Sequence, residues 1–148
     1  MSFAERSIVA ELLTFVSVIS LFTWILISRH AAGLFDGPQG LMHWARTVLW
    51  MIPVGIVVAI LTSLLWESGY RLVTRDSADE LTDERDRLIA GFGWKVTSIT
   101  ASTGFLLALG ALALGYSVLV TLNLMLVAFA LSDLTGNLAK LLRYRLGG

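Results

Sequence analysis

Four long apolar runs, separated by three polar segments, dominate the pattern of the chain. The runs cover residues 8–28, 42–66, 88–114 and 118–142. Each is long enough for a helix to cross the ~30 Å of hydrocarbon in a bilayer, which takes about 20 residues. In lipid, a spanning segment must satisfy its own backbone hydrogen bonds, and helices do so. The pattern therefore predicts an all-α protein, a bundle of four transmembrane helices.

The polar segments differ in length and character. Residues 29–41 are rich in Gly, Pro and Asp, which favour turns. Residues 67–87 carry seven acidic side chains against four arginines, a net charge of −3, so we expect this connection to lie in water. Residues 115–117 form a connection so short that the third and fourth spans must pair as an antiparallel hairpin.

A charged leader, residues 82–87, precedes the third apolar run and belongs to the same helix. Thr82 can serve as its N-cap, and Asp83 and Glu84 suit the positive end of the helix dipole. A helix over residues 82–114 would be about 50 Å long at 1.5 Å per residue. We therefore expect a long third helix that extends from the membrane into the cytoplasm.

Small side chains recur at spacings of three and four along this helix, which places them on one face. In lipid, helices associate through close van der Waals packing, and small residues permit it. This small-residue stripe is broad enough to contact both the fourth span and another chain. Its members are Gly93, Thr97, Ala101, Gly104, Ala108, Ala111 and Gly115.

Composition agrees with a single integral membrane domain over residues 1–148. The hydrophobic fraction is 56%, above the roughly 45–50% of soluble domains. A formal net charge of zero argues against nucleic acid as a partner, because phosphate contacts need a surplus of Lys and Arg. With no cysteine in the chain, disulfides and thiolate chemistry are excluded.

Basic residues predict the orientation. Four spans place both termini and the connection 67–87 on one side of the membrane, with nine of the eleven Lys and Arg residues; the other two are Arg29 and Arg46. Positive residues concentrate on the cytoplasmic side. We therefore expect both termini in the cytoplasm and a multi-pass protein of the bacterial cytoplasmic (inner) membrane.

Four ionisable residues lie within or at the ends of the spans, where they are costly and often functional. They are Glu11, Glu67, Lys95 and Asp133, all towards the cytoplasmic side. In the tight hairpin, positions whose numbers add to about 232 should face one another. Because a lysine stem can cover a one-turn offset, we predict an intramembrane ion pair between Lys95 and Asp133, supported by Asn137.

Asn123, Asp133 and Asn137 fall within one sector of the fourth span. A carboxylate in such a place could take up and release a proton or bind a cation. The structural interpretation is an ion pair with amide hydrogen bonds that fixes the hairpin. We favour the structural interpretation, because Asp133 has a base within reach.

Hydroxyl side chains cluster at 97–103 in the third span. Such residues more often bond a carbonyl of their own helix or a neighbouring helix than line a pore.

The chain offers little for catalysis or cofactors. His30, Asp36 and His43 contain metal-ligand types, but their spacing matches no helical ligand pair, and no nucleophile–base set or phosphate-binding loop occurs. We expect no enzyme activity, metal or cofactor.

The second half resembles small bacterial and archaeal membrane proteins of unknown function. The resemblance rests on the leader Asp83-Glu84-Arg85-Asp86, the Leu88-Ile89 pair after it, and a hydrophobic hairpin that ends in Arg143-Tyr144-Arg145. It covers residues 81–146. It implies a cytoplasmic leader on a two-helix hairpin and no catalytic residue.

These observations favour a non-enzymatic membrane subunit or scaffold that associates through small-residue helix faces. It would act as a homo-oligomer or as an accessory subunit of a larger membrane complex. The alternative is an oligomeric cation or proton transporter or channel that uses Asp133 and Lys95.

Overall fold

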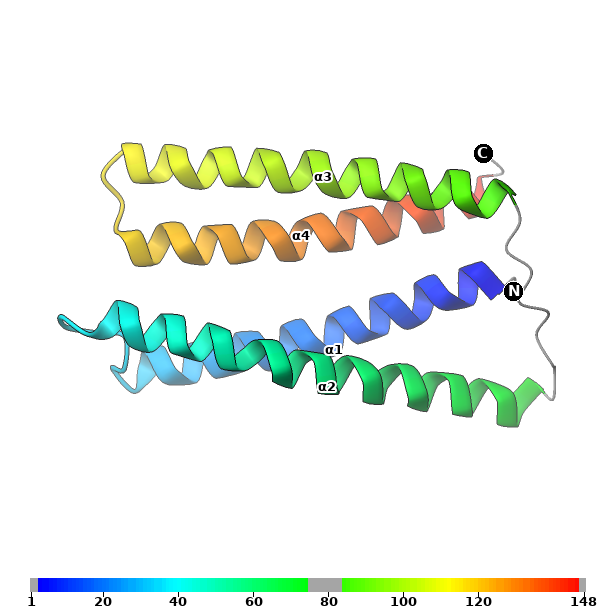
Figure 1. Cartoon of the computed structure of the whole chain (residues 1–148), viewed down its shortest axis with the longest axis horizontal. Helices are drawn as coiled ribbons and strands as arrows, with labels where there is room; N and C mark the ends of the chain where they lie inside the picture. Colours follow the sequence, from blue (N-terminus) through cyan, green and yellow to red (C-terminus); the bar gives the residue numbers. More distant parts are fainter. Residues whose placement is uncertain (1–2, 75–83, 147–148) are drawn as a thin grey trace. The chain divides into compact units, whose positions relative to one another are not determined.

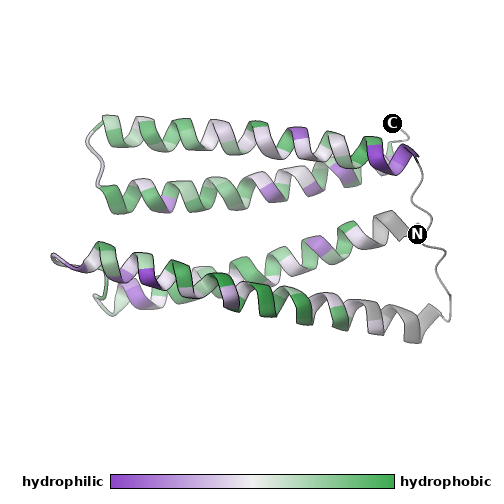
Figure 2. Cartoon of the chain, viewed as in Figure 1, coloured by the Kyte–Doolittle hydropathy of each residue, from purple (hydrophilic) through white to green (hydrophobic). Residues whose placement is uncertain are grey.

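The chain folds into four long helices. The computed structural model describes residues 3–74 and 84–146, with the backbone alone for 3–6, 67 and 70–74. The helices are α1 (Phe3–Ala31), α2 (Gly40–Thr74), α3 (Glu84–Ala113) and α4 (Val118–Arg145), and the described residues contain no strand (Figure 1). All four are long and apolar enough to cross a membrane (Figure 2). The all-α prediction with four candidate membrane-spanning helices is therefore confirmed.

Helix α2 is longer than the apolar run that predicts it. It continues through Pro53 and past Trp66 to Thr74, so the first eight residues of the predicted connection 67–87 are helical. This extension contains no proline, and its only glycine is Gly69, so nothing in the sequence ends the helix at Trp66. The N-cap prediction at Thr82 and the rest of the connection, residues 75–83, lie outside the described residues. The cytoplasmic placement of the termini stays a prediction.

The chain divides into two compact units. One comprises Ala10–Ser77, and the other comprises Met1–Val9 with Ala78–Gly148. The first unit contains the α1–α2 hairpin from Ala10 onwards, and the second contains the α3–α4 hairpin. A single bundle of all four helices stays a prediction.

The turn that joins α1 to α2 depends on glycine. The Gly33 N–H donates to the His30 carbonyl at 2.9 Å and the Leu34 N–H to the Arg29 carbonyl at 3.2 Å, the two bonds of a Schellman motif. Gly33 has a φ of +71°, a conformation that costs little only for glycine. Gly40, the first residue of α2, lies directly against the Phe35 carbonyl, and Phe35 is buried.

The α3–α4 connection closes in the same way. The Tyr116 N–H donates to the Ala111 carbonyl at 3.1 Å and the Gly115 N–H to the Leu112 carbonyl at 3.0 Å, and Gly115 has a φ of +89°. Ser117 then caps α4, its hydroxyl accepting from the Val120 N–H. The two helices run antiparallel and pack side by side (Figure 1), as the short connection predicts.

Candidate functional site

The α3–α4 hairpin contains most of the residues that the sequence singles out. Gly93 packs against the Lys140 side chain, Gly104 against Ala128, and Gly136 against Thr97. These pairs agree, to within one position, with the register expected from the short connection. The hairpin is held by close approach of the two helices, because a β-carbon at Gly104 would overlap that of Ala128.

The small-residue stripe faces α4. Ala108 is fully buried, and Gly93 is buried as well. Ala101, Gly104 and Ala111 are half-buried, and Gly115 lies in the turn after the helix. The stripe is therefore used within the chain, in the contact with α4, and its use by another chain stays a prediction.

A polar seam runs through the middle of the hairpin. The Thr135 hydroxyl lies 3.3 Å from the Thr100 hydroxyl and 3.0 Å from the Ser132 carbonyl. The buried Ser132 donates to the Phe129 carbonyl at 2.7 Å. On α3, Thr103 donates to the Ile99 carbonyl. The Thr135–Thr100 contact joins α4 to α3, whereas the other bonds named here stay within one helix.

Three side-chain contacts lie at the open end of the hairpin, where α3 begins and α4 ends; the first two join the helices and the third lies within α4. The Tyr144 phenol donates to the Asp86 carboxylate at 2.6 Å. The Arg143 guanidinium carbon lies 4.6 Å from the centroid of the Phe92 ring, a cation–π distance. The Lys140 ammonium donates to the Asn137 amide oxygen at 2.8 Å, and Asn137 is buried.

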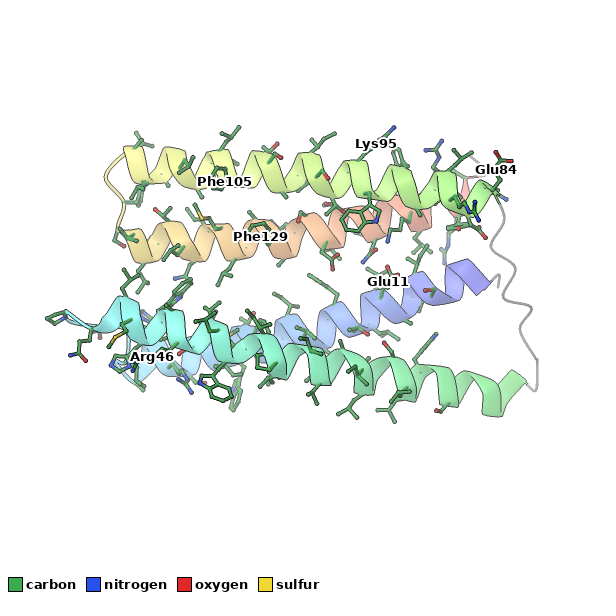
Figure 3. The ribbon with its side chains drawn as sticks, in the orientation of Figure 1. Glu11, Arg46, Glu84, Lys95, Phe105 and Phe129 are labelled. Atoms are coloured by element: carbon green, nitrogen blue, oxygen red, sulfur yellow. The ribbon has the colours of Figure 1, made fainter. Side chains whose placement is uncertain are left out.

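The structure does not bring Lys95 and Asp133 together. Both are exposed, and no ion pair joins them in the described part of the chain. Each helical residue turns the chain by about 100°, so Lys95, two residues after Gly93, lies on nearly the opposite side of α3. Its side chain points away from α4 (Figure 3). Asn137 is bonded to Lys140 instead.

The remaining predicted polar residues lie in different places. Glu11 is exposed on α1 (Figure 3), and Asn123 is half-buried on α4. Glu67 belongs to α2, and its side chain lies outside the described part of the structure.

A second cluster of polar residues lies at the turn end of the α1–α2 hairpin. An Arg29 guanidinium nitrogen donates to the Thr47 hydroxyl at 3.0 Å, and that hydroxyl donates to the His43 carbonyl at 2.9 Å. Thr47 is only 2% exposed. The His30 ring stacks on Phe35, with ring centroids 6.3 Å apart.

Metal-ligand side chains do not gather in the described ranges: no three or more of His, Asp and Glu there lie close enough to hold an ion. The hydrogen bonds described above lie within one helix or join a helix to its hairpin partner.

Sequence reasoning missed the contacts of Lys140, Tyr144 and Thr47. The spacing of Asn137 and Lys140, three residues apart on one helix, was a usable signal, because such pairs are neighbours on a helix surface. No comparable signal exists for the Tyr144–Asp86 or Arg29–Thr47 bonds, which join different helices.

Comparison with known proteins adds no assignment. No protein-family model matches the chain, and no curated protein or solved structure shows significant similarity to it.

Proposed function

We propose that this protein is a non-enzymatic subunit or scaffold of a cytoplasmic membrane, which associates with other chains through its outward helix faces. It acts as a homo-oligomer or within a larger membrane complex. The observation that carries this proposal is that two charged side chains, Lys95 and Asp133, are exposed on the outer helix faces. Small residues fill the contact with α4, whereas Ile99, Leu106 and Leu107 are each about two-thirds exposed.

Large apolar side chains on the outer surface can contact lipid at no cost in free energy, because lipid tails are as apolar as leucine. They give no reason for a partner by themselves. Polar side chains on the same outer surface do, since an unsatisfied polar group in hydrocarbon is costly. Lys95 and Asp133 are such groups, and they support association as the role of this surface.

Particle mass tests the proposal. The full chain is purified in native nanodiscs and measured by native mass spectrometry over a range of protein-to-lipid ratios. We expect a defined multiple of the 16.2 kDa chain, or a particle that contains other membrane chains. A single chain at every ratio, with no co-purifying chain, would contradict the proposal.

The alternative, an oligomeric cation or proton transporter or channel, rests on the same two charges, Lys95 and Asp133. Flux assays in liposomes distinguish this alternative from the subunit proposal. Asp133→Asn abolishes flux in a transporter while particle mass is kept. Wild-type liposomes without any flux contradict the transporter and leave the subunit proposal standing.

A further inference from the structure

Two side chains of opposite charge lie on the outer surface of the α3–α4 hairpin without a partner among the described residues. Lys95 on α3 and Asp133 on α4 are both exposed, and neither forms an ion pair or hydrogen bond with a residue that the structure describes. Both lie well inside helices long and apolar enough to span a membrane. Charges at such positions almost always pair or face a polar cavity.

The face of α3 that carries Lys95 has further unsatisfied polar groups. Ser98 and Ser102 follow Lys95 at spacings of three and four, which places all three on one side of the helix. Both serines are exposed and make no hydrogen bond within the described ranges, unlike the nearby Thr103, which bonds the Ile99 carbonyl. This outer polar face lies opposite the contact with α4.

Asp133 is exposed, although nearby residues of α4 are buried and hydrogen-bonded within the hairpin. Ser132 is buried and bonded to Phe129, and Asn137, one turn later, is buried and bonded to Lys140. Phe129, one turn earlier, is 59% exposed (Figure 3). The carboxylate therefore stands on an outer face of α4, beside an exposed aromatic ring.

The register of the hairpin places the two charges at similar levels. Gly93 faces Lys140 and Thr97 faces Gly136, so Lys95 is level with about position 138 of α4. Asp133 is then about five residues away, roughly 7.5 Å along the axis at 1.5 Å per residue. An extended lysine side chain bridges most of that offset.

We propose that Lys95 of one copy forms an ion pair with Asp133 of a neighbouring copy. The proposal rests on the association proposed above and commits it to a homo-oligomer. The strong bias of Lys and Arg towards one predicted side gives every copy the same orientation. The level of Lys95 relative to Asp133 is then the same between copies as within one. When α3 of one copy lies beside α4 of the next, the two helices are antiparallel, as in the hairpin itself.

A second copy fits this surface better than an unrelated chain. The two charges, which have no partner in the described ranges, are complementary to each other. This makes the outer faces of α3 and α4 complementary between copies. Because the paired residues belong to different helices, the contact closes either as two reciprocal pairs in a dimer or as one pair per interface in a ring.

Charge reversal with mixing tests the pair. In nanodiscs, the K95D variant alone places two acids at each interface and the D133K variant alone places two bases. We expect the association constant of each single variant to fall by roughly tenfold, which is read as a smaller oligomeric fraction at the same protein-to-lipid ratio. Co-expressed with different affinity tags, the two variants should co-purify in equal amounts. The double variant K95D/D133K should re-form the homo-oligomer.

The outcomes separate this proposal from its alternatives. A pair within one chain would be restored in the double variant but not in the mixture of single variants, and would overturn the proposal. Charges that only reach lipid headgroups would leave both single variants as oligomeric as wild type, which would also overturn it. A wild-type particle built with a different chain would do the same, although the general association proposal would survive. R46D is the control, because Arg46 is an exposed charge at the turn end of the other hairpin (Figure 3).

A cross-linking experiment covers the case in which charge reversal prevents folding. The chain has no cysteine, so K95C and D133C variants with different tags each carry one reactive thiol. In membranes that contain both, a thiol-reactive cross-linker of short span should produce a mixed dimer with both tags. R46C paired with D133C should not. Absence of the mixed dimer alongside a folded oligomer would overturn the proposal.

Discussion

The Tyr144 phenol donates a hydrogen bond to the Asp86 carboxylate at 2.6 Å, and this bond joins the charged leader of α3 to the basic end of α4. Asp86 belongs to the leader Asp83-Glu84-Arg85-Asp86 and Tyr144 to the tail Arg143-Tyr144-Arg145. The bond closes the open end of the hairpin, at the opposite end from the Gly115 turn. Leader and tail are therefore parts of one structural unit, although 58 positions separate them.

Tyr144→Phe removes this bond and leaves the ring in place. We expect a loss of about 1 kcal/mol, the scale of one hydrogen bond exposed in part to water. The measurement is unfolding in detergent by titration with SDS, followed by circular dichroism. Tyr116→Phe is the matched control, because Tyr116 is 58% exposed in the connection. Equal midpoints for the two variants would show that the Asp86 contact contributes nothing.

Gly136→Ala introduces a β-carbon that overlaps the Thr97 hydroxyl and lies 3.1 Å from the Gly93 carbonyl oxygen. Overpacking of this kind typically costs about 1–3 kcal/mol. Adding Thr97→Ala should return part of the loss, since it removes the overlapping oxygen. The two changes are therefore non-additive in a double-mutant cycle.

Gly110→Ala is the control for that cycle, because nothing lies within 4 Å of a β-carbon there. It should be neutral or stabilising by up to about 1 kcal/mol, as alanine favours a helix over glycine. A loss at Gly110 as large as that at Gly136 would mean that the contact with Thr97 does not limit the packing.

Thr47→Val keeps the side-chain shape and removes a buried hydroxyl that bonds Arg29 and the His43 carbonyl. We expect a loss of about 1 kcal/mol, read as a lower thermal midpoint in detergent. Thr103→Val is the comparison, because the exposed Thr103 bonds only its own helix. The prediction fails if Thr103→Val lowers the midpoint as much as Thr47→Val.

Gly40→Ala places a β-carbon onto the Phe35 carbonyl. The turn can accept it only by moving backbone, so we expect a loss of about 1–3 kcal/mol. Gly69→Ala adds the same methyl to the same helix where nothing lies within 4 Å. The difference between the two thermal midpoints measures the constraint in the turn, and equal midpoints would exclude it.

The fold could be predicted from the sequence because its determinants are local. The length of each apolar run predicts a spanning helix, and a three-residue connection leaves the hairpin one register. That register is seen in the contacts Gly93–Lys140 and Gly104–Ala128.

The partners of the charged residues were harder to predict. The position of a residue along the helix axis can be calculated from the length of the connection. The direction in which its side chain points around that axis also requires a residue known to face the other helix. Gly93 and Thr97 are such residues, and Lys95, which lies between them, must face the other way. The Arg29–Thr47 bond depends on how the α1–α2 turn rotates one helix against the other, which no spacing reveals.

The closeness of α3 and α4 has a consequence for tracing ancestry. At Gly136 and Gly104, any larger residue overlaps the facing helix, whereas most outer positions need only be apolar. Selection should therefore allow the outer residues to vary and keep glycine at the contact positions Gly93, Gly104 and Gly136. Gly93 and Gly104 are eleven positions apart, and Gly104 and Gly136 are thirty-two positions apart. Distant kin of this chain are better sought by that glycine signature than by overall similarity.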